Sequence, residues 1–139
     1  AWVYSEHGSN FVKTMLRLMS EKDKLGVVND QRGSPTYALD LAKMIWQIAD
    51  HELFTAGIYH WTDAGNITWC DFAKAIQQEA LKAGRLSKVI PINPITTEDY
   101  PTPAVRPTYS VLSNGKLAKL VGVEPIPWRQ SLKLMLTRL

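Results

Sequence analysis

The sequence predicts an α/β fold in which short buried strands alternate with amphipathic helices. Runs of β-branched and aromatic residues are each followed by a polar loop and then by apolar residues at helical spacing. Capping residues and glycines mark the boundaries of several of these helices. With 139 residues, 45% of them hydrophobic and 21% charged, the composition is that of one globular domain. The repeated alternation favours a layered architecture with at least partly parallel strands.

The first strand is expected over residues 2–4. A helix should follow it, capped by Ser9 or Asn10, because apolar residues recur at helical spacing: Phe11, Val12, Met15, Leu16 and Met19. Gly26 is expected to close this helical region, and a short central strand then covers residues 27–28.

The stretch 27–42 has the strongest signals for a ligand site. Its strand leads into a polar loop in which Gly33 can take a positive φ. Ser34 can then cap a helix with Pro35 at its first position, or Thr36 can cap it instead. This arrangement places free backbone N–H groups at the sheet edge where open α/β folds bind ligands. The alternative is an ordinary strand-to-helix connection.

The helix expected over residues 35–50 is apolar over a wide arc, so we expect it to lie between two layers. A strand is expected over residues 57–62. The next helix should begin at a capping box formed by Thr68 and Asp71, and it should stop at Gly84.

Residues 89–92 form a short edge strand at most, because the proline among them has no N–H to donate. The segment 91–107 holds five of the eight prolines, and an irregular segment of that length tends to be functional. A short helix capped by Ser113 should end at Gly122, and a final amphipathic helix should begin near Trp128.

Charge and composition exclude several classes of partner. The net charge is +3, but the basic residues are scattered, so we expect no nucleic acid partner. No apolar run approaches the length of a membrane span, so we expect no membrane partner. The single cysteine, Cys70, excludes an internal disulfide and suits the reducing cytoplasm. The three histidines lack metal-ligand spacing, so no metal site is expected.

The motifs of common catalytic sites are missing from the sequence. There is no G-x-S-x-G, no P-loop, no triple-glycine dinucleotide motif, and no tyrosine with a lysine four residues later. We therefore expect the chain not to be catalytic by itself. Because the sequence starts directly with strand-like residues, we also expect residues 1–139 to be one piece of a longer protein.

The sequence does contain candidate ligand-binding residues. Arg106 lies in a proline-flanked loop and Arg32 precedes an expected helix N-terminus, so either guanidinium could clamp a phosphate; the alternative for both is a surface arginine. Trp2 and Tyr4 are expected at the C-terminal end of a strand, where an indole can stack on a base or a sugar; the alternative is a core position. The helical tryptophans are expected in the core: Trp46, Trp69 and Trp128.

Taken together, three parts of the sequence resemble the dTDP-4-dehydrorhamnose reductase family of extended short-chain dehydrogenases. They are W-V-Y at 2–4 with N-F-V-K-T-M-L at 10–16, D-Q-x-G-S-P-T at 30–36, and R-P-x-Y-S-x-L at 106–112. The resemblance implies the C-terminal half of such an enzyme: late Rossmann strands and helices plus the substrate-binding subdomain. The N-terminal half would hold the glycine-rich turn for NADPH or NADH and the Tyr-x-x-x-Lys pair.

The family resemblance also implies a function. The parent enzyme would reduce the C4 ketone of dTDP-4-dehydro-L-rhamnose, in the biosynthesis of dTDP-rhamnose for O-antigen or cell-wall polysaccharide. Residues 1–139 would hold the dTDP-sugar, with the missing N-terminal half as their partner; a homodimer is compatible with this. Trp2 matches the tryptophan that contacts the dTDP-sugar. Arg106 and the loop of Gly33, Ser34, Pro35 and Thr36 would line the pocket and contact the pyrophosphate.

Two other functions stay open at the level of sequence. The same fold family includes non-catalytic regulatory subunits, such as that of methionine adenosyltransferase. A stand-alone sugar-nucleotide binding module is the third reading. A Tyr-x-x-x-Lys pair upstream of residue 1 would indicate an enzyme, and its loss would indicate a partner subunit.

Overall fold

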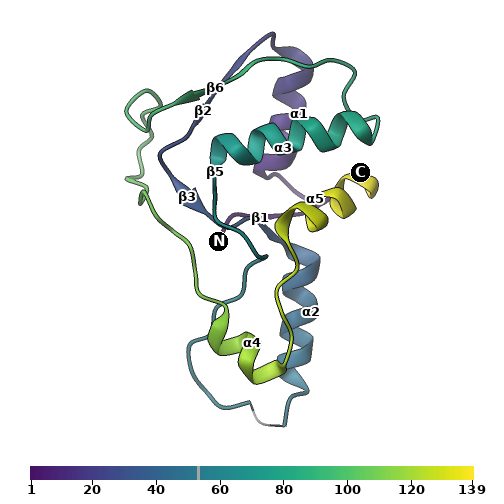
Figure 1. The fold of residues 1–139 in the computed structure, drawn as a ribbon, viewed down its shortest axis with the longest axis vertical. Coiled ribbons are helices and arrows are strands. Elements are labelled where there is room, and N and C mark those ends of the chain that lie inside the picture. Colours follow the sequence, from purple (N-terminus) through teal and green to yellow (C-terminus); the bar gives the residue numbers. More distant parts are fainter. Residues whose placement is uncertain (53) are drawn as a thin grey trace.

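The computed structural model describes residues 1–52 and 54–139 and confirms the α/β class (Figure 1). Its described strands form three two-stranded ladders, two of which are parallel. They are β1 (Val3–Tyr4) with β4 (Thr36–Tyr37) and β2 (Leu25–Val28) with β6 (Ile92–Ile95), both parallel, and β3 (Arg32–Gly33) with β5 (Ile67–Thr68), antiparallel.

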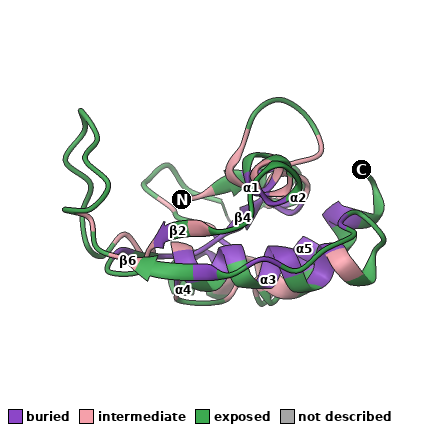
Figure 2. Ribbon diagram, turned by 90° about the horizontal axis from the view of Figure 1, so that it is seen from above, coloured by how far each residue is buried: buried purple, intermediate pink, exposed green. Residues whose placement is uncertain are grey.

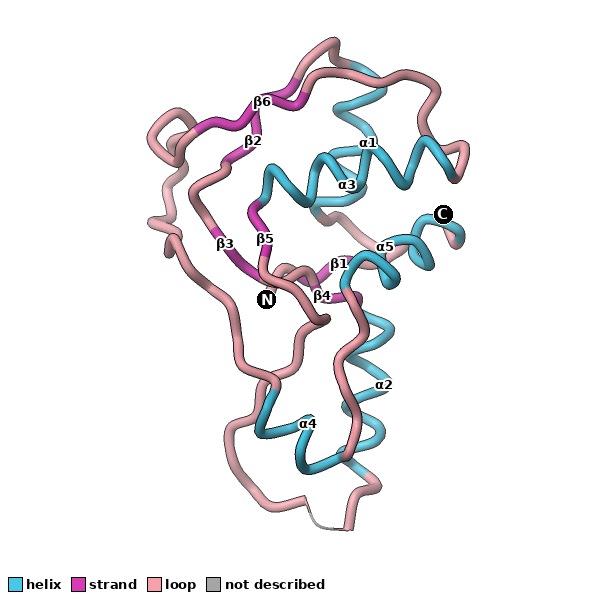
Figure 3. The backbone as a smooth tube through the Cα atoms, in the orientation of Figure 1, coloured by secondary structure: helices cyan, strands magenta, loops and turns pink. Residues whose placement is uncertain are grey.

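The helices divide into two groups in space. The described ones are α1 (Phe11–Glu21), α2 (Ala38–Ala49), α3 (Trp69–Lys82), α4 (Gly115–Val121) and α5 (Trp128–Thr137). Helices α1, α3 and α5 gather around the ladders in the upper body, whereas α2 and α4 extend together to the lower end (Figure 3). The upper body therefore has most of the core.

Helix α3 is the centre of that core. Phe72, Ala73 and Ile76 are fully buried on it, between the apolar faces of α1 and α5. Figure 2 shows the same pattern, with buried residues concentrated along α3 and α5. The apolar residues whose 3.6-residue spacing predicted these helices are thus the residues through which the helices pack against one another.

Several predicted helix boundaries are confirmed. The Asn10 side chain accepts the Lys13 N–H at 3.2 Å and caps α1. The capping box at α3 is complete: Thr68 Oγ1 accepts the Asp71 N–H at 3.0 Å, and Asp71 accepts the Thr68 N–H at 3.1 Å. Gly122 ends α4 in the left-handed conformation, with φ 66°.

The predicted start of α2 is wrong. Ser34, Pro35 and Thr36 do not begin the helix, because Thr36 lies in β4 and Tyr37 takes the N-cap position. The Tyr37 N–H donates to Asp63 Oδ2 at 3.1 Å. A side-chain carboxyl group 26 residues away thus satisfies the backbone group that a local cap would have satisfied.

The strand predicted over 57–62 is not formed. Thr62 donates its N–H to Asn114 Oδ1 and accepts from Asn114 Nδ2 at its carbonyl, both at 2.9 Å. A side-chain amide thus replaces the neighbouring strand that a ladder would need. The predicted strand 89–92 is shifted to β6, and Gly26 lies inside β2 instead of closing α1, which ends at Glu21.

Helix α2 is not covered on both sides as predicted. Ile45 is 57% exposed and Trp46 is 70% exposed, so Trp46 is not a core residue. The helix runs away from the upper body along most of its length (Figure 1), which leaves this part of its apolar arc uncovered. Trp69 and Trp128 are half-buried against the core, and Tyr4 is a core residue.

Candidate functional site

A cavity of about 620 Å³ lies between α1, β2, the start of α3 and the proline-rich segment that follows β6. Apolar side chains form most of its wall, among them Phe11, Met15, Leu18, Val28 and Trp69. Its polar side chains are Thr14, Gln31, Tyr100, Thr102 and Arg106. An apolar hollow with a few convergent polar groups is the usual form of a small-molecule site.

Two aromatic rings, inclined to each other by 50°, form part of this wall. The rings of Phe11 and Trp69 pack at 4.5 Å between centroids, where α1 and α3 begin side by side. The capping residue that starts each helix therefore also sets the position of the ring beside it. The face of one such ring can stack a planar ligand group such as a nucleobase.

The segment that carries Tyr100, Thr102 and Arg106 is fastened at both ends. At its start Thr97 donates its N–H and its hydroxyl to Asp30, at 2.9 and 2.7 Å. At its end the Arg32 N–H donates to the Thr108 carbonyl at 2.8 Å. These anchors fix the two ends of the segment, and the exposed Arg106 between them is one of the residues that line the cavity, where a guanidinium can meet an anionic group.

Trp2 lies one layer behind the cavity wall. It precedes β1 instead of ending it, and its indole stacks on Trp69, with 3.6 Å between centroids and 13° between planes. The indole also packs close to Gly33, where a Cβ atom would lie 2.4 Å from Trp2 Cε2. Trp2 and Arg106 thus belong to the same region, but it is Trp69 that separates Trp2 from the cavity.

Replacing Gly33 by alanine should push the Trp2 indole off Trp69, because the added methyl group would occupy the place of the ring. We expect a loss of about 1–3 kcal/mol in the free energy of unfolding. Urea unfolding followed by tryptophan fluorescence measures it. Gly115→Ala is the matched control, since its Cβ would meet Ser113 Oγ at an ordinary 3.7 Å. Equal stability of the two variants would contradict the packing.

The other predicted binding residues hold the 63–66 loop and the β ladders. Ser34 donates its hydroxyl to the Gly65 carbonyl at 2.6 Å, and Thr36 donates to the Ala1 carbonyl at 2.6 Å. Arg32 donates from Nε to Asn66 Oδ1 at 3.0 Å. Pro35 is buried with Ser34 and Thr36. Of the six predicted residues, the structure therefore places Arg106 in the cavity wall.

Sequence reasoning missed several lining residues. Phe11 and Trp69 read as ordinary members of apolar helix faces, and only their position at the helix starts exposes them to the cavity. Gln31 and Tyr100 had a usable signal, since both lie in the segments that the sequence marked as functional. Their shared location could not be inferred, because it depends on long-range contacts of Asp30 and Thr97.

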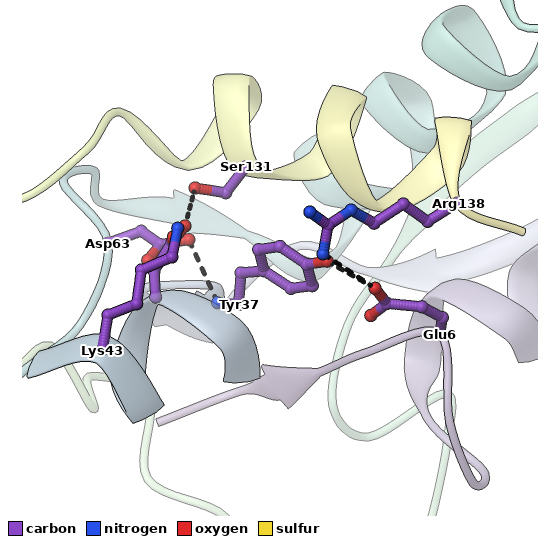
Figure 4. A network of polar contacts seen from close by, with 7 residues as sticks. Glu6, Tyr37, Lys43, Asp63, Ser131 and Arg138 are labelled. Carbon is purple, nitrogen blue, oxygen red and sulfur yellow. Dashed lines mark hydrogen bonds and ion pairs between the residues drawn. The ribbon is translucent and has the colours of Figure 1, made fainter. Parts of the chain in front are cut away.

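A second polar cluster joins α2, α5 and the 62–66 loop (Figure 4). Asp63 accepts the Tyr37 N–H, and Asp40 accepts the Ser131 hydroxyl at 2.8 Å and pairs with Lys43 at 3.3 Å. Burial raises the pKa of Asp63 to about 7, and the negative charge of Asp40 adds to this effect. These contacts tie α2 to the core and lie outside the lining of the cavity.

Tyr37 extends this cluster toward α5. Its hydroxyl donates to Glu6 Oε1 at 2.7 Å, and Arg138 lies 3.6 Å from the same oxygen (Figure 4). Within residues 1–52 and 54–139, no three histidine, cysteine, aspartate or glutamate side chains group closely enough to hold a metal ion. None of the helices in this part of the chain is long and apolar enough to cross a bilayer.

The comparisons with known proteins agree with one another. The family model described as RmlD substrate binding domain matches residues 1–139. The chain is 46% identical to the dTDP-4-dehydrorhamnose reductase of Aggregatibacter actinomycetemcomitans, covering 96% of this chain and 47% of that protein. It is 42% identical to the spore coat polysaccharide biosynthesis protein SpsK of Bacillus subtilis, covering 96% and 44%.

A solved structure gives the same result. The dTDP-4-dehydrorhamnose reductase of Bacillus anthracis in complex with NADP superimposes with a TM-score of 0.88 and 34% identity, over 99% of this chain and 46% of that one. The chain therefore spans about half the length of the relatives that it matches.

Proposed function

This chain belongs to the RmlD substrate binding domain family, and on that premise we propose that it holds the nucleotide sugar of a dTDP-4-dehydrorhamnose reductase. Membership in the family confirms the resemblance found in the sequence. The observation that carries the proposal is the cavity itself, which combines an aromatic apolar wall with the guanidinium of Arg106. A nucleotide sugar needs both surfaces, because its base is flat and its diphosphate is anionic.

In the proposed complex, the thymine base of a dTDP-sugar lies along the wall formed by Phe11 and Trp69. Arg106 faces the diphosphate. Trp2 supports Trp69 from behind, and Arg32 and Ser34 hold the loop that carries Asn66. Thr36 fixes the backbone at Ala1, and Pro35 is buried beside it. These residues therefore contribute to the site by shaping it, and Arg106 contributes by direct contact.

The described residues do not fit a nicotinamide cofactor. A dinucleotide cradle needs a glycine-rich turn between a strand and a helix. Strand β4 leads directly into α2, and the connection from β1 to α1 contains one glycine, Gly8. We therefore derive no hydride step from this chain. Binding of NADPH or NADH, the proton-donating tyrosine and the reduction of dTDP-4-dehydro-L-rhamnose are proposed for the longer protein.

The proposed biological setting is the supply of dTDP-rhamnose for surface polysaccharide, in the cytoplasm. Its support comes from the names of the relatives, two of which concern dehydrorhamnose reduction and one polysaccharide biosynthesis. A homodimer is compatible with the proposal, and the N-terminal half of the longer protein is its necessary partner.

Changing Arg106 to glutamine tests the proposed diphosphate contact. We expect dTDP to bind about 10- to 100-fold more weakly, because a charge-assisted hydrogen bond contributes about 1.5–3 kcal/mol. Isothermal titration calorimetry with dTDP measures the change. Arg17→Gln is the matched control, since Arg17 lies on α1 in an exposed pair with Glu21. Equal affinities in Arg106→Gln and Arg17→Gln would refute the contact, and no binding of dTDP to the unaltered protein would refute the function.

A further inference from the structure

Gln31 is a buried polar side chain in the wall of the cavity. It lies in the short loop between β2 and β3, is 6% exposed, and lines the cavity together with Val28 and Arg106. Its Nε2 atom lies 3.1 Å from Thr97 Oγ1, across 66 positions of sequence. Polar side chains at this depth usually have hydrogen-bond partners, so the orientation of the amide is informative.

The neighbours of Thr97 fix that orientation. Thr97 Oγ1 lies 2.7 Å from Asp30 Oδ1, and the Thr97 N–H donates to Asp30 Oδ2 at 2.9 Å. These two hydrogen bonds hold the pKa of Asp30 below its usual range, so its carboxylate is ionised at neutral pH and can only accept. The hydroxyl proton of Thr97 therefore goes to Asp30.

It follows which end of the Gln31 amide faces Thr97. A hydroxyl oxygen that has given its proton to Asp30 can only accept from Gln31, so the partner must be the NH₂ group. The carbonyl oxygen Oε1 is then the free end of the amide. No hydrogen bond among the described residues uses this atom, although Gln31 forms part of the cavity wall. The cavity thus contains an oriented acceptor.

The nucleoside of dTDP has two hydrogen-bond donors, the imide N3–H of thymine and the 3′-hydroxyl of the deoxyribose. The diphosphate oxygens accept and cannot serve an acceptor. We propose that Gln31 Oε1 accepts a hydrogen bond from one of these two donors, and that Asp30 and Thr97 are positioning residues that keep the amide in that orientation. This inference rests on the proposed function, and it adds the residue that reads the nucleoside.

A fixed acceptor also provides selectivity. A base with an acceptor at the equivalent edge, as cytosine has at N3, would face Gln31 Oε1 with like partial charges and gain no hydrogen bond. An amide that could turn freely would present its NH₂ group to such a base, whereas an amide held through Thr97 and Asp30 cannot. Sites built around such oriented polar groups reject analogues that lack the matching group.

The test compares dTDP with two analogues that each lack one donor, 3-methyl-dTDP and 3′-deoxy-dTDP, by isothermal titration calorimetry. For the unaltered protein we expect one analogue to bind about tenfold more weakly than dTDP. Weak binding of the 3-methyl analogue identifies the imide, and weak binding of the 3′-deoxy analogue identifies the hydroxyl. In Gln31→Met, dTDP itself should bind about tenfold more weakly and the preference over that analogue should disappear.

Thr97→Val tests the positioning role at a site that does not line the cavity. Loss of the hydroxyl releases the Gln31 amide, so discrimination between dTDP and the weaker analogue should fall about threefold or more. Thr96→Val is the matched control, because Thr96 makes similar bonds to Asp99 and none to Gln31. It should keep the discrimination of the unaltered protein.

Three outcomes would overturn the inference. They are unchanged affinity for dTDP in Gln31→Met, undiminished discrimination in that variant, and equal binding of dTDP and both analogues by the unaltered protein. Failure of the unaltered protein to bind dTDP would be a different result, because it would remove the proposed function and this inference with it. Circular dichroism of each variant shows whether a loss of binding accompanies a loss of folding.

Discussion

Replacement of Phe72 by alanine is expected to lower the free energy of unfolding by about 3–5 kcal/mol. The Phe72 ring is fully buried on α3. Its centroid lies 5.6 Å from those of Tyr4 and Phe11 and 5.7 Å from that of Trp128, so it joins β1, α1 and α5 to one another. Large rigid rings cannot collapse into the space that the side chain leaves, and the cavity term should therefore be large.

Urea unfolding of the variant and of Phe54→Ala measures this effect against a matched truncation. The Phe54 ring is 40% exposed and contacts Tyr59 at 5.2 Å, so its loss should cost about 1 kcal/mol or less. Phe72→Leu, which keeps most of the volume, should fall between the two. The central place of Phe72 would be refuted if Phe72→Ala and Phe54→Ala lowered the unfolding midpoint equally.

The parts of the fold that the sequence predicted well are those that depend on local chemistry. Asn10 satisfies the N–H of Lys13, and Thr68 and Asp71 satisfy each other, all within one helical turn. Apolar residues of α1, α3 and α5 repeat at helical spacing because these helices pack together. Their caps and periods are visible without any knowledge of the remaining chain.

The wrong predictions share a long-range cause. The Tyr37 N–H is satisfied by Asp63, and the backbone of Thr62 is satisfied by the amide of Asn114, 52 residues away. Neither partner can be identified from spacing. The exposure of Trp46 has a similar origin, because it depends on the direction in which α2 leaves the upper body and not on the composition of the helix.

The candidate site was only partly predictable, because some of its residues are marked by local sequence and others are placed by long-range contacts. Prolines and the polar loop marked the segments that carry Arg106 and Gln31, and both residues line the cavity. Trp2 lies in the predicted region but does not line the cavity as a ligand-contacting residue would, because its indole packs on Trp69. Which atom of Gln31 faces the ligand follows only from Thr97, which is distant in sequence and adjacent in space.

Replacing Asp63 by asparagine should stabilise the protein at pH 8 by up to about 4 kcal/mol, with little change at pH 4. The Asp63 carboxyl is 1% exposed, and its Oδ1 atom has no hydrogen-bond partner among the described residues. Burial, together with the charge of Asp40, raises its pKa from 3.8 to about 7. Asparagine keeps an acceptor for the Tyr37 N–H and removes the charge.

The direction of the pH dependence follows from the raised pKa. Below pH 3.8 the carboxyl is protonated in both the folded and the unfolded chain, so its contribution to stability is fully present. As the pH rises toward about 7 the unfolded chain ionises first, and that contribution is progressively lost. The hydrogen bond from the Tyr37 N–H to Asp63 reduces the loss without reversing it, because burial is the largest cause of the raised pKa.

Urea unfolding of the unaltered protein and of Asp63→Asn at pH 4 and pH 8 gives the difference directly. Asp50→Asn is the control, since Asp50 is exposed at the end of the same helix, α2, and should leave the pH dependence unchanged. A stability difference between Asp63→Asn and the unaltered protein that is the same at both pH values would show that folding does not raise the pKa of Asp63. In that case Tyr37 and α2 would be held by a carboxylate and not by a carboxyl group that keeps its proton.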